Sequence, residues 1–205
     1  VNARDSSITD LAYMSGRVLV SGLAAGDSPS SVREFDFPFN EQAKGFRVEI
    51  FHGAHGKNED HAPIQTFVPF NIDGEPSLLA GYQCTPLVKI PVAGIEEGGK
   101  VKGTTVAELG NRNRPLDMIV YQQNGADYLL LANSDRGVMK ITTENIAENQ
   151  GLTERVSRGE TAGQTYETID DLQGVVQLDK LDDAHALVLI GQSGGPLALR
   201  SVELP

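Results

Sequence analysis

Three of the four histidines in this 205-residue chain lie in one segment, 52–61. The segment contains His52, His55 and His61, with the carboxylates Glu59 and Asp60 beside them. Imidazole is the commonest metal-binding side chain, and neighbouring carboxylates suit Zn, Mn or Fe. Gly53 and Gly56 give the backbone the freedom to bring the rings together. The spacing matches no established zinc signature. Three interpretations therefore stay open: a metal or cofactor site, another binding or catalytic role, and a polar surface loop.

Two arginines, Arg112 and Arg114, stand beside asparagines in a second polar segment. A guanidinium fork binds a carboxylate or a phosphate through two parallel hydrogen bonds. The pair therefore predicts a contact with an anion or a carbohydrate. The alternative is a structural salt bridge to Glu108 or Asp117.

Four polar residues occupy the same position relative to four small residues that end apolar strands. The pairs, each 20 residues apart, are Asn2 with Gly22, His61 with Gly81, Arg112 with Ala132, and Asp171 with Gly191. A position that serves only the fold tends to keep one residue type. We therefore expect Asn2, His61, Arg112 and Asp171 to share a ligand-binding face, the alternative being a variable surface loop.

The elements that must position these residues are short strands. An apolar strand that ends in a small or polar residue recurs four times, at 17–23, 77–82, 128–134 and 186–193, and a second strand follows each copy. Strand patterns also precede the copies, and Asp73-Gly74 and Asn124-Gly125 between strands are strong hairpin signals. The only helical candidate, 144–152, is polar. The chain is predicted to be all-β.

Repeats of this size, built from three clear strands and a weaker fourth, are typical of propeller blades. The approximate repeats are 1–52, 53–108, 109–156 and 157–205. In this general sense the chain resembles β-propeller repeat proteins, although it has no tryptophan and lacks the WD and kelch signatures. The resemblance implies a single propeller-like domain of four blades. We expect it to be part of a larger propeller, completed by another polypeptide or a missing segment. The alternatives are four blades that close alone and, as the rival fold, a β-sandwich.

Composition and charge argue against several classes of function and structure. The net charge of −11 argues against nucleic-acid binding, which needs a basic face. No apolar run approaches the ~18 residues of a membrane-spanning helix. The single cysteine, Cys84, excludes an intrachain disulfide and is expected to be a small buried residue, with a reactive thiol as the alternative. Because the chain begins with Val1, we expect either a processed protein, periplasmic or secreted, or a fragment of a longer protein.

Two functions follow as hypotheses. The first is a binding or assembly module with a polar end face for a small-molecule or anionic ligand. The second is an enzyme or an oxidoreductase subunit that holds a metal or cofactor at the mouth of the propeller channel. In that case His52, His55 and His61 would be metal ligands or general bases, and the two arginines would bind an anionic substrate.

Overall fold

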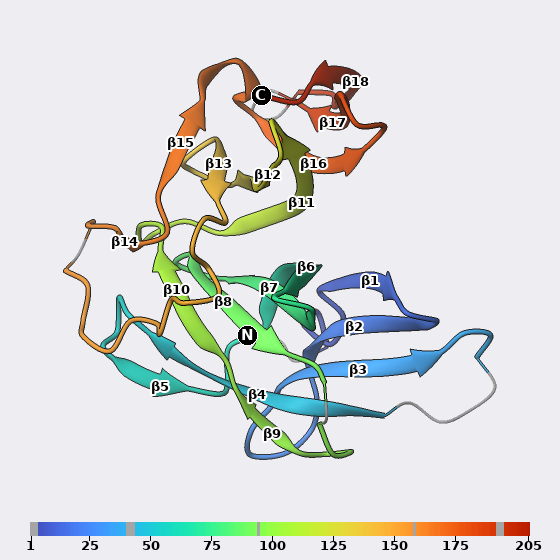
Figure 1. The fold of residues 1–205 in the computed structure, drawn as a ribbon, viewed down its shortest axis with the longest axis vertical. Helices are drawn as coiled ribbons and strands as arrows, with labels where there is room; N and C mark the ends of the chain where they lie inside the picture. The colour runs from blue at the N-terminus through green and yellow to red at the C-terminus, as the bar shows by residue number, and fades with distance from the viewer. Residues whose placement is uncertain (1–3, 40–43, 94, 158, 192–194) are drawn as a thin grey trace.

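The computed structural model describes residues 4–39, 44–93, 95–157, 159–191 and 195–205, and it is all-β. Its strands form four mainly antiparallel sheets that follow one another along the chain (Figure 1). The first sheet contains β1 (Asp10–Met14), β2 (Arg17–Leu23), β3 (Ser30–Asp36), β4 (Lys44–His52) and β5 (Lys57–Glu59), and β9 (Lys100–Lys102) pairs with β4 in parallel. The second sheet contains β6 (Ile64–Ile72), β7 (Glu75–Tyr82), β8 (Pro86–Pro91), β10 (Thr104–Glu108) and β14 (Ala162–Gly163).

The other two sheets come from the second half of the chain. The third contains β11 (Pro115–Gln123), β12 (Ala126–Asn133), β13 (Val138–Thr142) and β15 (Tyr166–Ile169). The fourth contains β16 (Val175–Lys180), β17 (His185–Ile190) and β18 (Ala198–Glu203), after a short 3-10 turn, η1 (Asp170–Leu172). The segment 144–152 forms turns rather than a helix, in agreement with its lack of an apolar face.

Local sequence explains the hairpins that open the second and third sheets. Asp73 and Gly74 both have positive φ, 52° and 86°, and Asn124 and Gly125 have φ of 53° and 80°. Two-residue turns with both central residues in this region match the twist of the flanking strands, and they favour Asp-Gly and Asn-Gly. The predicted hairpin turns are therefore confirmed.

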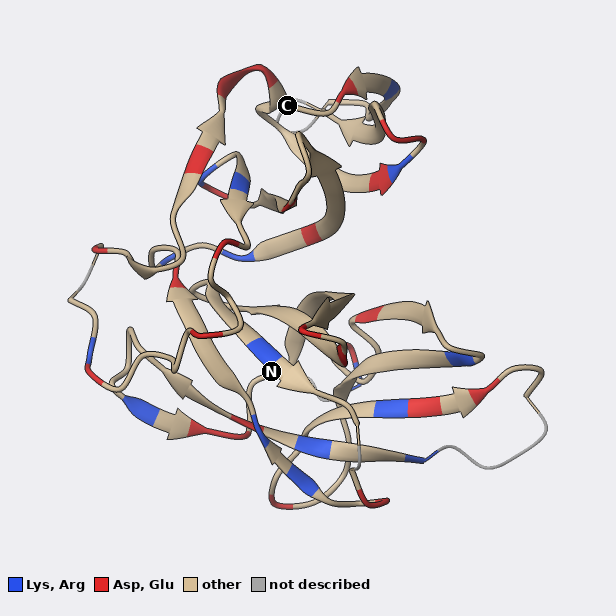
Figure 2. Cartoon of the chain, in the orientation of Figure 1, with Lys and Arg blue, Asp and Glu red and all other residues tan. Residues whose placement is uncertain are grey.

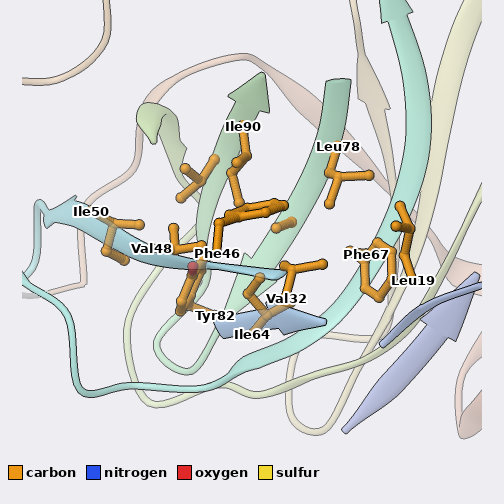
Figure 3. Close-up of a cluster of buried hydrophobic side chains, with 12 residues drawn as sticks. Leu19, Val32, Phe46, Val48, Ile50, Ile64, Phe67, Leu78, Tyr82 and Ile90 are labelled. Carbon is orange, nitrogen blue, oxygen red and sulfur yellow. The ribbon is translucent and has the colours of Figure 1, made fainter. Parts of the chain in front are cut away.

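Hydrophobic cores lie between consecutive sheets. Strand β7 sends Leu78 and Ala80 to the core against the first sheet and Leu79 to the core against the third sheet. Strand β12 divides its side chains between two cores in the same way. Figure 3 shows the first of these cores, with Phe46 and Tyr82 among its largest side chains. Alternation along a central strand thus joins each inner sheet to both of its neighbours.

The first strands of the four sheets, β1, β6, β11 and β16, line a common cleft of about 370 Å³. Here Asp10 accepts a hydrogen bond from the Phe67 N–H, and Asp117 accepts one from the Leu178 N–H, each at 2.8 Å. These bonds join the first sheet to the second and the third to the fourth. No closed barrel or ring of sheets is identified in the described part of the chain, so the propeller remains a prediction.

One face of each terminal sheet has no covering sheet among the described residues. On the first sheet this face exposes Leu11, Tyr13 and Phe37, and Tyr13 and Phe37 contact each other edge to face. On the last sheet Leu199 is 70% exposed and pairs with Leu189. Two apolar sheet faces are therefore open to solvent.

Lys and Arg lie on β4 and β9, β3 carries both basic and acidic residues, and the turn after β16 is acidic (Figure 2). Within the described ranges, no helix has the length and apolar character needed to cross a membrane.

Candidate metal centre

His52 is the last residue of a strand whose alternate side chains enter the first core. Phe46, Val48 and Ile50 are buried in β4, and His52 continues the same face at 3% exposure. Strand β5 then returns along β4, and Ile50 pairs with Glu59. Cross-strand and diagonal neighbours share one face of a sheet. The hairpin therefore places the Glu59 carboxylate beside the His52 ring.

Glu59 binds both imidazoles of the hairpin. Its Oε2 lies 3.0 Å from Nδ1 of His52, and its Oε1 lies 2.8 Å from Nδ1 of His55. The two rings face each other with centroids 3.8 Å apart. The turn 53–56 keeps them together, because the N–H groups of His55 and Gly56 donate to the His52 carbonyl.

Burial and these contacts shift the pKa of Glu59 and of His52. Burial acts to raise the pKa of Glu59, but hydrogen bonds from His55 and His52 outweigh it and lower that pKa below its usual value. Burial lowers the pKa of His52, despite its bond to Glu59. A neutral imidazole that donates from Nδ1 to a carboxylate carries a lone pair on Nε2. The Nε2 of His52 is buried and has no hydrogen-bond partner among the described residues.

Cys84 reaches the same place from the second sheet. It lies in the turn between β7 and β8, which is closed by a hydrogen bond from the Thr85 N–H to the Tyr82 carbonyl at 2.8 Å. Cys84 occupies the third position of this turn with φ of 67°, a conformation that favours Gly or Asn. A second segment fixes the turn, because the Cys84 N–H donates to the Asn113 carbonyl. Non-glycine residues held in this region are enriched at functional sites.

Together, His52, His55 and Cys84 form a potential metal-binding group. One ligand atom from each, an imidazole nitrogen or the thiol sulfur, lies within 4.8 Å of the others. Nitrogen and sulfur donors suit zinc and copper. A carboxylate that holds the outer nitrogen of a metal-bound histidine is the usual second layer of such a centre, and Glu59 takes that place for both rings.

Glu108 packs against the backbone between the two histidines. Its Oε1 accepts a hydrogen bond from the Ala54 N–H at 3.1 Å, while its Oε2 is buried without a partner. A Cβ built on Gly53 would lie 2.7 Å from the Glu108 Cγ, so only glycine fits at that position. Burial raises the pKa of Glu108 to about 7. The carboxyl is thus a second buried polar group at this hairpin.

The other predicted site residues lie outside this group. His61 is exposed, although its charge contributes to lowering the His52 pKa. Arg112, Arg114 and Asp171 are exposed, and Asn2 lies outside the described residues. A shared ligand-binding face of Asn2, His61, Arg112 and Asp171 therefore stays a prediction.

The two carboxylates considered as salt-bridge partners for the arginines accept backbone hydrogen bonds instead. Glu108 binds the Ala54 N–H, and Asp117 binds the N–H groups of Met118 and Leu178. The arginine segment is held by its own backbone, since Ser134 accepts from the Arg114 N–H and donates to its carbonyl.

Sequence reasoning identified His52 and His55 but not Cys84 as a potential ligand. The structure places Cys84 half-buried beside the histidines rather than fully buried. No spacing rule connects a cysteine in one sheet with histidines in another. Comparison with protein-family models and with curated proteins gave no match.

Proposed function

We propose that this chain is a metal-binding module in which His52, His55 and Cys84 hold a transition-metal ion. The observation that carries the proposal is the buried, unpartnered Nε2 of His52, together with the Glu59 carboxylate that orients both imidazoles. Buried polar atoms nearly always have a partner, and an orphan needs an explanation. A metal ion supplies that partner.

Zinc is the first choice among the metals. Zn–N bonds of about 2.0 Å and Zn–S bonds of about 2.3 Å put tetrahedral donor atoms roughly 3.3–3.6 Å apart. The three donor atoms here lie within 4.8 Å of one another, so a small inward movement of His55, whose side chain is 46% exposed, completes the geometry. Two histidines and a cysteine also suit copper, which makes Cu the competing ion in the test.

The test is metal stoichiometry and affinity of the purified protein, measured by elemental analysis and by competition with a chromogenic chelator. We expect about one Zn²⁺ per chain in the native protein, and loss of binding in His52→Gln and Cys84→Ser. His185→Gln is the matched control, because His185 is half-exposed and bonded to Asp182 at 2.9 Å, away from the group. His61→Gln tests whether the metal is held by the three histidines or by His52, His55 and Cys84. If metal binding were lost in His61→Gln but kept in Cys84→Ser, the proposed ligand set would be wrong.

A second proposed function is assembly. The four sheets would be consecutive blades of a larger propeller. Another polypeptide would supply the remaining sheets of the ring and so cover the open faces of the first and last sheets. Two observations support this: each inner sheet has a hydrophobic core on both faces, while Tyr13 and Leu199 remain exposed on the terminal sheets. One sheet cannot bury both of its faces alone. Export to the periplasm or the medium is part of the same proposal.

The mass of the native particle tests this second function. We expect a mass above the 22.0 kDa of the lone chain, with a second polypeptide or a second copy in the particle. A native particle of 22.0 kDa would contradict it.

A further inference from the structure

We infer that the ion at His52, His55 and Cys84 keeps one coordination position open and binds a small anion or water there. This inference rests on the proposed metal site. It goes beyond that site by assigning a class of ligand to the metal ion. It also distinguishes a metal centre that can bind a ligand from a purely structural one.

The first argument is the number of donors. The described residues bring three ligand atoms within 4.8 Å of one another, whereas a structural zinc site closes with four protein ligands. Glu59 is not free to be the fourth, because its Oε1 and Oε2 each bind an imidazole. Binding the ion through Glu59 would release the histidines that it orients.

The second argument is access. The His52 side chain is 4% exposed and closes the inner side of the site, but the His55 side chain is 46% exposed. The exposure of Cys84 is intermediate. A ligand from solvent therefore reaches the ion on the side of His55, while the core protects the opposite side.

The third argument is charge. A Zn²⁺ ion with one thiolate and two neutral imidazoles carries a net charge of about +1, because thiolate is the form that binds metal, and the Glu59 carboxylate bonded to both rings brings this sum close to zero. The Lys57 ammonium lies 3.3 Å from the Glu59 carboxylate, and the Arg155 Nε lies 3.4 Å from the Ala54 carbonyl. Lys57, on the hairpin, thus offsets the Glu59 charge, and Arg155 adds a second cation beside the hairpin, so the sum of these charges is positive. Small anions are the class of ligand that such a site favours.

Two side chains could instead close the site from the protein. Glu108 has a buried, unpartnered Oε2, and His61 is close enough to influence the His52 pKa. Neither belongs to the group of atoms within 4.8 Å. The experiment must therefore include both residues.

Cobalt substitution is the decisive experiment. Co²⁺ replaces Zn²⁺ in the metal-free chain of residues 1–205. Its visible bands report the ligand geometry, and a thiolate band reports Cys84. We expect azide to shift the visible bands in a saturable way in the wild-type protein, with the thiolate band retained. His185→Gln should behave as wild type.

The outcomes separate the two levels of the proposal. Absence of Co²⁺ binding would overturn the metal site itself. Co²⁺ binding with the thiolate band but no response to azide would overturn the open position while the metal site stands. A response that appears only in Glu108→Gln or His61→Gln would identify that residue as the fourth ligand and overturn the inference as well.

Discussion

The Nδ1 of His52 lies 3.0 Å from the Oε2 of Glu59, and each of the two side chains is only 4% exposed. A buried histidine and a buried carboxylate in this arrangement leave one imidazole nitrogen without a partner. The same carboxylate holds His55 with its other oxygen. Glu59 therefore fixes the orientation of two rings, and the properties of the site depend on it.

Glu59→Gln is expected to weaken metal binding. An amide can accept from only one of the two imidazoles, so one ring loses its orientation, and such changes typically reduce metal affinity by about 10- to 100-fold. Competition with a chelator of known affinity measures the loss. Glu49→Gln is the control, since Glu49 lies on the same strand and pairs with Lys100. Equal affinity in the Glu59 variant and in wild type would show that Glu59 does not position the ligands.

Cys84→Gly should stabilise the metal-free protein and abolish metal binding. The left-handed backbone at Cys84, with φ of 67°, suits glycine. Relief of this conformation is worth about 1 kcal/mol, partly offset by the greater freedom of glycine in the unfolded chain. Urea unfolding in the presence of a chelator measures the first effect, and Zn²⁺ titration measures the second.

Ser15→Gly provides the matched control for that variant. Ser15 is an exposed turn residue with φ of 51°, so it should show a similar change in stability with unchanged metal binding. If Cys84→Gly were clearly less stable than wild type without metal, Cys84 would serve the fold and not the site.

Glu108 should make the metal-free protein less stable as the pH rises. Its folded pKa of about 7 lies above the ordinary value of 4.5, so the folded protein holds a proton that the unfolded chain has released. Stability is then lost between about pH 4.5 and pH 7, by up to about 3 kcal/mol. Urea unfolding at pH 5 and pH 8, with a chelator present, should show the difference.

Glu108→Gln should remove most of that difference, because the amide oxygen still accepts from the Ala54 N–H and the group no longer titrates. Its unfolding free energy at pH 8 should equal or exceed that of wild type. An unchanged pH dependence in this variant would assign the effect to another carboxyl, such as Asp117, whose pKa burial raises to about 6.

Leu199→Glu should reduce the mass of the native particle without destabilising the chain. Leu199 is 70% exposed on the open face of the last sheet, so its replacement should change the unfolding free energy by less than about 0.5 kcal/mol. A charge buried against another sheet would oppose association strongly. Light scattering and thermal unfolding measure the two effects. Thr168→Glu, at an exposed position of β15, adds the same single negative charge and is the charge control.

Local sequence was sufficient for most of the strands and for several turns, but not for β5, which carries Glu59, nor for β14 and β15. Asp73-Gly74 and Asn124-Gly125 required a hairpin because few residues adopt positive φ at both central positions. The apolar runs at 77–82 and 128–134 were predicted to be strands, and β7 and β12 form there with consecutive buried residues that face two different cores. Position along the chain also brought His52 and His55 together, since they flank one tight turn.

Tertiary structure alone decided the third residue of the potential metal-binding group and the order of the sheets. Cys84 meets the histidines because the first core packs β4 of one sheet against β7 of the next, and residues far apart in sequence become neighbours only through that burial. The same packing leaves His61, which is closer in sequence, outside the group. Local hydrogen bonds and turn preferences act over a few residues, so strands and turns can be predicted from the sequence. The contacts that create this site depend on how whole sheets bury their apolar faces, which a local pattern does not encode.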